Sequence, residues 1–158
     1  MQDADVESLR TVADYQFAAG AGTALFPEDG HLEVRRSSTG RPQQVARGDG
    51  GRLVSVGLDG RFTLGTAGGQ RLVDALPHPV ARVVVGDDSE PFVREGKNVF
   101  AKFVQAVDPA VRADDEVAVV HESGALLAVG RAELDAQSML DFETGMAVMV
   151  RSGVDPEQ

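Results

Sequence analysis

The sequence predicts an α+β protein made of two small units, an α+β unit followed by a small β-barrel with short helices. Three observations support this fold class. The chain opens with apolar residues at helical spacing, short alternating segments separated by turn residues fill most of the rest, and two prolines interrupt the pattern near its middle. With 158 residues, 42% hydrophobic and 25% charged, the chain has room for one ordinary or two small globular domains.

The first unit, residues 1–76, is predicted to hold a helix, four short strands and a second helix. Apolar residues at helical spacing predict the first helix over 4–18, and Gly20 and Gly22 are expected to form its C-cap and turn. Turn residues such as Asp59-Gly60 separate the expected strands, which are 32–36, 43–47, 52–58 and 61–64. A short helix is expected over 69–76.

Two prolines in Leu76-Pro77-His78-Pro79-Val80 favour an extended connector, which we expect to be the boundary. In the second unit, residues 77–154, the expected strands are 80–85, 96–104, 116–121, 126–130 and 146–151. Asp87-Asp88-Ser89 is expected to cap a helix that runs through Arg94, and Ser138 a helix over 139–143. The chain is expected to be loose from Ser152, with a flexible tail at 155–158. Five or six short strands with two short helices are typical of a small barrel with helical plugs.

The segment Gly96–Val104 is predicted to be a strand with two different faces. Alternation places Val99, Ala101 and Phe103 on the face that enters the core. Asn98, Phe100, Lys102 and Val104 then lie on the other face. That face offers an ammonium group for phosphate, an amide for a base edge and a ring for stacking, which are the groups that bind a single-stranded nucleic-acid end.

The charge balance points in two directions. A net charge of −10 and a pI near 4.6 argue at face value against nucleic acid. Only Lys97 and Lys102 are lysines among the 15 basic residues. Abundant acidic residues with few lysines are typical of cytosolic proteins from salt-accumulating organisms. A halophilic origin would therefore account for the acidity. Residues 31–71 carry four excess positive charges and 103–158 eight excess negative ones.

Other chemistries have weak support in the sequence. Without cysteine there is no disulfide or thiolate metal site, and the three histidines are not at metal-ligand spacing, so neither a metal nor a cofactor is expected. A phosphate loop has a strand before it and Lys-Ser/Thr after it, and Gly20-Ala21-Gly22 has neither. No serine lies in a nucleophile-elbow motif. Without a long apolar run or a secretory signal, we expect a cytoplasmic binding protein rather than an enzyme.

Several segments together resemble a PUA domain, a family named after pseudouridine synthases and archaeosine transglycosylases. They are 96–104, 115–120 (Asp-Glu-Val-Ala-Val-Val), 126–132 (Leu-Leu-Ala-Val-Gly-Arg-Ala) and 145–148 (Gly-Met-Ala-Val). The residues of these segments are similar to the C-terminal part of archaeal tRNA-guanine transglycosylases. Through 13–17, 24–27, 38–41 and 59–65, the first unit resembles the small domain that precedes PUA in those enzymes. The resemblance covers roughly residues 8–152.

The resemblance implies an RNA-docking module without the family's catalysis. Those enzymes carry a large barrel domain with an aspartate nucleophile and a cysteine-bound zinc, and this chain has neither the cysteines nor the room. In PUA domains, RNA lies between the first helix, the glycine loop after it and a late strand, and the ligand is often an acceptor stem with its 3′ end. The RNA-binding residues implied here are Arg94, Gly96, Lys97, Asn98, Phe100 and Lys102, flanked by Arg131 or Arg151. A secondary track is implied for Arg35, Arg36, Arg41 and Arg47.

Each implied role has a structural alternative: Gly96 can be a plain helix C-cap, Phe100 can pack against the first unit, and the arginines of 31–71 can be ordinary surface charges. Two functions follow. One is an RNA-binding protein, with tRNA as its expected ligand, that supports a tRNA-modifying enzyme. The other is a protein-interaction subunit whose acidic C-terminal face binds the catalytic partner. An enzyme acting in the groove is a third, weaker alternative, and neither DNA nor a membrane is expected as a partner.

Overall fold

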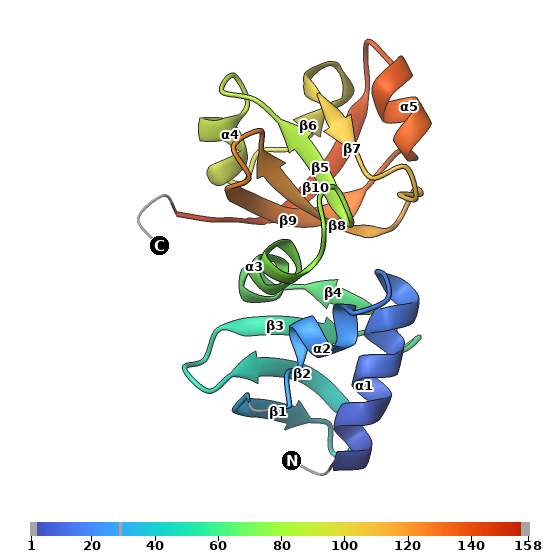
Figure 1. Ribbon diagram of the computed structural model, residues 1–158, viewed down its shortest axis with the longest axis vertical. Helices are drawn as coiled ribbons and strands as arrows, with labels where there is room; N and C mark the ends of the chain where they lie inside the picture. The colour runs from blue at the N-terminus through green and yellow to red at the C-terminus, as the bar shows by residue number, and fades with distance from the viewer. Residues whose placement is uncertain (1–2, 29, 156–158) are drawn as a thin grey trace. The chain divides into compact units, whose positions relative to one another are not determined.

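The computed structural model describes residues 3–28 and 30–155 (Figure 1). The chain divides into two compact units, residues 1–76 and 77–158. Each unit contains helices and its own β-sheet, and the sheet of the second unit is curled into a half-barrel with short helices around it. The predicted fold class is therefore confirmed. Among the described residues, no helix has both the length and the apolar character needed to cross a membrane.

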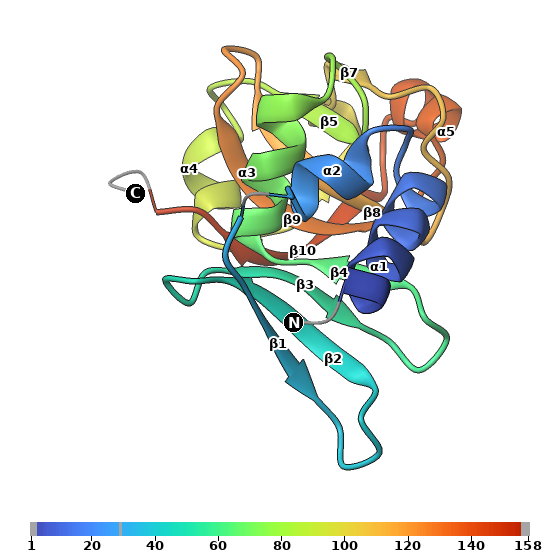
Figure 2. The same cartoon turned by 60° about the horizontal axis from the view of Figure 1, so that its bottom comes forward.

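The first unit is an antiparallel sheet with helices on one face (Figure 2). Its strands, in spatial order, are β1 Leu32–Arg36, β2 Pro42–Arg47, β3 Arg52–Val56 and β4 Phe62–Leu64. Its helices are α1 Asp3–Gln16, α2 Ala21–Leu25 and α3 Thr66–Ala75. Val45, Val54 and Leu64 stand opposite one another across three strands and are fully buried, as a helix-covered face requires.

Two contacts fix α1 and α2 on this sheet. The Gln16 side chain donates to the Phe62 carbonyl and accepts from the Phe62 N–H, both at 2.7 Å, so it pairs with the edge strand β4 as another strand would. Phe26, directly after α2, meets the Phe62 ring edge-on at a centroid distance of 6.0 Å. The aromatic pair and the Gln16 amide thus attach both helices to the same strand.

The predictions that treated glycines as helix ends are wrong at two places. Instead of forming a turn, Gly22 lies inside α2, where an added Cβ would be 2.4 Å from the Arg10 carbonyl oxygen on α1. Helix α3 begins at Thr66 rather than at residue 69, and Gly68 lies inside it, where an added Cβ would be 2.0 Å from the Leu53 oxygen. In both helices glycine allows backbones to approach closely, and this packing outweighs its low helix propensity.

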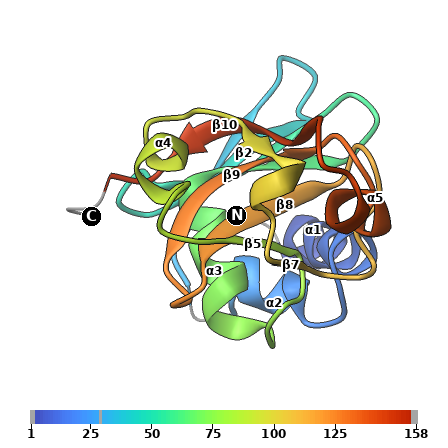
Figure 3. The ribbon, with the colours of Figure 1, turned by 90° about the horizontal axis from the view of Figure 1, so that it is seen from above.

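The second unit is a sheet in the spatial order β6-β10-β9-β8-β5-β7 (Figures 1 and 3). Its strands are β5 Arg82–Val85, β6 Val99–Phe100, β7 Ala106–Val107, β8 Glu116–His121, β9 Leu126–Ala132 and β10 Met146–Gly153. β5 and β8 are parallel and the other pairs antiparallel. Helices α4 Glu90–Arg94 and α5 Ala136–Asp141 lie at opposite ends of the sheet, which encloses a core of valines with Leu127 and Met139.

Two boundary predictions in this unit are wrong. Helix α5 begins at Ala136, three residues before the predicted start, and its N-cap is Asp135, not Ser138. The Asp135 carboxylate accepts the Ser138 N–H at 2.8 Å, and this hydrogen bond lowers the pKa of Asp135. β10 continues to Gly153 and the Val154 N–H donates to Leu127, so the chain is not loose from Ser152. Of the predicted flexible tail, residues 156–158 lie outside the described residues.

Candidate nucleic-acid interface

The loop after α4 is closed by Gly96 in a conformation that favours glycine. Its φ is +96°, its N–H donates to the Val93 carbonyl, and the Lys97 N–H donates to the Phe92 carbonyl, each at 2.9 Å. This is the hydrogen-bond pattern of a glycine C-cap, as the sequence predicts. A Cβ added at Gly96 would meet nothing within 4 Å, so the outer side of the loop is open. Gly96 therefore caps the helix and also exposes backbone that a ligand can approach.

The predicted strand over 96–104 is wrong except at Val99 and Phe100. β6 pairs with β10 only at Val99 and Phe100, and the chain then forms the 3₁₀ turn η1, Ala101–Phe103. The pairing ends because the Ala101 N–H already donates to Gly145, in the turn before β10, and the chain bends toward β7. Val99 and Ala101 are buried as predicted, whereas Phe103 is 38% exposed rather than in the core.

The bend gathers two rings and an ammonium group on the surface. Phe100 is 48% exposed, and the Lys102 Nζ lies 5.1 Å from the centroid of the Phe103 ring. A pocket of about 380 Å³ opens beside η1, lined by residues 86–89 and 102–105. Neither Lys97 nor Lys102 forms an ion pair with any residue that the structure describes. Both lysines are therefore available to phosphate groups.

Asn98 has a structural task that the sequence does not reveal. Its Oδ1 accepts the Val150 N–H at 2.9 Å. β6 pairs with β10 only through Val99 and Phe100, and Asn98 is the residue directly before β6. The Asn98 side chain thus adds a contact with β10, so its amide NH₂ group is the part that remains for an RNA contact.

Two of the implied arginines hold the unit together. Arg94 binds Glu90 with its Nε at 3.0 Å, and its Nη1 donates to the Val154 carbonyl at 3.1 Å. Arg151, the bulged residue of β10, forms a two-bond ion pair with the buried Glu116 of β8, with Nη1 at 3.2 Å from Oε2. The guanidinium groups of both residues are therefore directed at the protein itself.

The remaining implied arginines differ in how far they are engaged. Arg131 is half-exposed and binds Glu133 at 3.2 Å, so it is a weakly paired surface charge. In the first unit, Arg36 binds Asp5 and the Gly40 carbonyl, Arg41 donates to Gly57, and Arg47 binds Asp49 at 3.1 Å. Arg35 is exposed, and its side chain forms no hydrogen bond or ion pair with the described residues. Of the implied secondary track, Arg35 is the member that is unengaged.

A cluster of Asp87, Glu90 and His121 is the grouping that sequence reasoning missed. Their ligand atoms lie within 4.8 Å of one another, although 34 positions separate Asp87 from His121. The predicted cap at Asp87–Ser89 is wrong, because Ser89 makes no side-chain cap bond and Asp87 binds His121 at 2.6 Å.

The hydrogen bonds of His121 favour a structural link over a metal site. The Ser123 N–H donates to the Nδ1 of His121 at 3.0 Å, so the neutral ring carries its proton on Nε2 and donates it to Asp87. A metal on Nε2 would move that proton to Nδ1, which lies 3.0 Å from the Ser123 nitrogen and 2.9 Å from the Ser123 hydroxyl oxygen, so the ring would lose the hydrogen bond from the Ser123 N–H. We interpret the cluster as a tie between the end of β8 and the loop before α4.

Comparison with known proteins identifies both units. Residues 7–79 match the patch-forming domain C2 of tRNA-guanine transglycosylase, and residues 81–154 match the PUA domain. A tRNA-guanine(15) transglycosylase of Pyrococcus furiosus is 46% identical over 95% of this chain, which covers 25% of that protein. The corresponding enzyme of Methanothermobacter thermautotrophicus is 43% identical over 94% of the chain and 23% of its own length.

Solved structures show the same fold at lower identity. A PUA domain protein of Thermoplasma acidophilum superposes over 100% of this chain and 93% of its own, with a TM-score of 0.67 and 21% identity. A PUA domain of Aeropyrum pernix K1 gives a TM-score of 0.71 at 19% identity over 99% of this chain and 86% of its own. The chain spans about a quarter of the length of the curated relatives it matches. It therefore consists of a patch-forming C2 domain followed by a PUA domain, and matches the C-terminal part of tRNA-guanine transglycosylases.

Proposed function

We propose that the second unit binds RNA at the Gly96 loop, and that its ligand is the acceptor stem and single-stranded 3′ end of tRNA. The observation that carries this proposal is the open glycine loop, followed along the chain by two lysines without ion pairs and two exposed rings. The PUA match and the tRNA-modifying relatives support RNA, and tRNA in particular, as the ligand. The role is non-catalytic, in support of tRNA modification by a catalytic domain that acts together with this chain.

Each group at the loop has a distinct task. Gly96 allows the RNA backbone to approach closely, and Lys97 and Lys102 bind its phosphates. Phe100 stacks on an unpaired base, and the pocket beside Phe103 has space for another. The NH₂ group of Asn98 donates to a base edge or a ribose hydroxyl. Arg94 and Arg151 act indirectly, by fixing α4 and β10, and Arg131 flanks the surface.

Salt would decide which of these contacts matters most. The acidic composition supports a protein adapted to high intracellular salt, where the Debye length falls to about 3 Å at 1 M. Counterion release then contributes little to affinity. Stacking and short hydrogen bonds at the Gly96 loop would supply most of the binding free energy, and outlying arginines little.

A second function is favoured by a different surface of the same unit. Leu140 and Phe142 are 51% and 47% exposed, and they alternate with the acidic residues Asp141 and Glu143 at the end of α5. This apolar and acidic surface suits a protein partner, and the partner we propose is the catalytic subunit. Co-purification separates the two functions, because bound nucleic acid supports the first and a stoichiometric protein the second.

The RNA proposal is tested by adding a side chain at Gly96. Asparagine accepts a positive φ, so Gly96→Asn keeps the cap but fills the open space outside the loop. We expect the tRNA affinity, measured by fluorescence anisotropy, to fall about tenfold, or ~1.4 kcal/mol.

The matched control is Gly124→Asn, in the turn between β8 and β9. Gly124 has a φ of +100° and, like Gly96, nothing within 4 Å of an added Cβ. The two variants should lose similar stability, yet the control should keep the wild-type tRNA affinity. An equal loss of affinity in both would show that the Gly96 loop does not contact RNA.

A further inference from the structure

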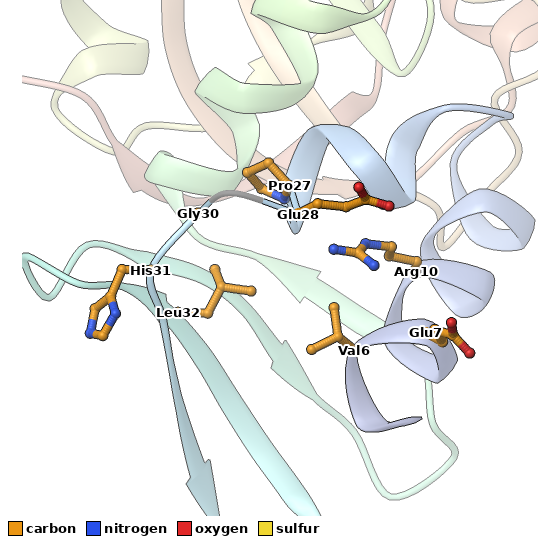
Figure 4. A pocket seen from close by; sticks show the side chains of 8 residues that line it. All are labelled: Val6, Glu7, Arg10, Pro27, Glu28, Gly30, His31 and Leu32. Carbon is orange, nitrogen blue, oxygen red and sulfur yellow. The ribbon is translucent and has the colours of Figure 1, made fainter. Parts of the chain in front are cut away.

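The first unit contains a pocket that the RNA proposal does not use. It has a volume of about 450 Å³ and lies between α1, the segment after α2 and the start of β1 (Figure 4). Val6, Leu32 and Pro27 give it apolar walls, and Arg10 and Glu28 bring opposite charges to it, with Glu7 one turn before Arg10. All these residues belong to the first unit, so the pocket depends on that unit alone.

Arg10 is held in place before any ligand arrives. Its Nε donates to the Phe26 carbonyl at 2.7 Å, and α2 packs against α1 at this position through Gly22. Among the described residues no carboxylate lies within 4.0 Å of its guanidinium, and its Nη1 and Nη2 have no hydrogen-bond partner. Figure 4 shows the guanidinium extending from α1 toward the space beside Val6 and Leu32. The site therefore presents a fixed pair of N–H donors.

The charges around this donor pair select the chemistry of the ligand. The Glu28 carboxylate offsets the charge of Arg10, so neither a phosphate or another simple anion nor a simple cation is favoured. A ligand that fits must offer acceptors to Arg10 and donors to Glu28 while contacting apolar side chains with its faces. Guanine has this pattern, with acceptors at O6 and N7 and donors at N1–H and the 2-amino group.

We infer that this pocket binds a guanine base, with Nη1 and Nη2 of Arg10 donating to O6 and N7 and the Glu28 carboxylate accepting from N1–H and the 2-amino group. Val6 and Leu32 contact the faces of the ring. The base comes either from a free guanine nucleotide or from an unstacked guanosine of an RNA. Adenine is rejected because it turns its 6-amino donor toward Arg10.

The inference is tested by NMR titration of the ¹⁵N-labelled full chain with GMP, IMP and AMP, which share ribose and phosphate. GMP should bind at least about tenfold tighter than AMP, since a bidentate contact contributes about 1–3 kcal/mol of discrimination. IMP lacks the 2-amino group and should bind between the two. Shifts should centre on residues of the first unit around Arg10 and Leu32. AMP binding as tightly as GMP would overturn the inference.

Two substitutions separate recognition from folding. Glu28→Gln changes an exposed side chain, so the protein should still fold. Its affinity for GMP should fall about tenfold, and the difference between its affinities for GMP and IMP should become smaller. Glu33→Gln, an exposed acid of β1 outside the pocket, is the control and should bind GMP as wild type. Arg10→Lys keeps the charge, loses the paired donors and should abolish the preference for GMP over AMP. Unchanged GMP affinity in Glu28→Gln would overturn the inference.

A second arm distinguishes the two sources of the base. Oligonucleotides with unpaired guanosines or unpaired adenosines are titrated in the same way, and the Glu28→Gln variant reports whether the first unit is responsible. If GMP saturates the pocket, a free guanine nucleotide is sufficient as the ligand. If only the oligonucleotide with unpaired guanosines binds, the ligand is a guanine base of an RNA. If neither guanine source shifts the resonances around Arg10, the inference is wrong. The RNA proposal for the Gly96 loop is untouched by that result, because it concerns residues of the second unit.

Discussion

Phe100→Ala is expected to weaken tRNA binding by about tenfold or more, and the loss should persist at molar salt. The ring is 48% exposed next to the Gly96 loop, so its removal takes away a stacking surface without opening the core. Stacking of a base on an aromatic side chain contributes about 1–3 kcal/mol and does not depend on counterion release. The measurement is fluorescence anisotropy with labelled tRNA at about 0.1 M and about 1 M salt.

Two substitutions in the first unit serve as controls for Phe100→Ala. Tyr15→Ala removes a ring that is 94% exposed, and Arg35→Gln removes an unengaged charge. Tyr15→Ala should leave the tRNA affinity unchanged, and Arg35→Gln should lower the tRNA affinity only at low salt. Equal losses for Phe100→Ala and Arg35→Gln at high salt would show that stacking at the loop does not dominate. Asn98 is less suitable for this test because its Oδ1 also holds the Val150 N–H.

Gly153→Ala is expected to lower the free energy of unfolding by about 3 kcal/mol and to impair RNA binding as well. A Cβ at this position would lie 2.0 Å from the Arg94 carbonyl oxygen and 3.0 Å from that of Val93. These are backbone atoms of α4, so the helix itself must shift, and the Gly96 loop with it. Chemical denaturation measures the first effect and tRNA binding the second.

Ser152→Ala is the control for Gly153→Ala because it alters the neighbouring residue of β10 without adding volume. It should change the free energy of unfolding by less than about 0.5 kcal/mol. If Gly153→Ala were as stable as wild type, the close approach of β10 to α4 would not be needed to hold the Gly96 loop in place. The proposal that this contact supports RNA binding indirectly would then be wrong.

Local patterns predict most of the fold because they are dictated by neighbouring residues. Alternation and turn residues such as Asp59-Gly60 locate the sheet of the first unit, and the glycine C-cap at Gly96 is predicted correctly. The strand predicted over 96–104 fails because its length depends on β10, which offers partners only to Val99 and Phe100. Alternation gives the faces of a strand but not the point at which its partner ends.

The composition of the site is harder to predict because its charges are paired over long distances in the sequence. Arg151 and Glu116 are 35 positions apart, and their ion pair turns an expected phosphate ligand into a structural residue. Lys97 and Lys102 keep their expected exposure. The glycines inside α2 and α3 are hard to interpret from the sequence for a related reason. The backbone that each glycine allows to approach closely belongs to another element of the fold.

The central claim is that the Gly96 loop binds the single-stranded 3′ end of a tRNA. The most direct measurement compares the affinity of the full chain for one tRNA with and without its unpaired 3′ nucleotides, at about 1 M salt, where the Debye length is about 3 Å. The account predicts that removing these nucleotides weakens binding at least about tenfold, because the bases that stack on Phe100 and enter the pocket beside Phe103 are lost. Equal affinity for the intact and the trimmed tRNA would contradict it.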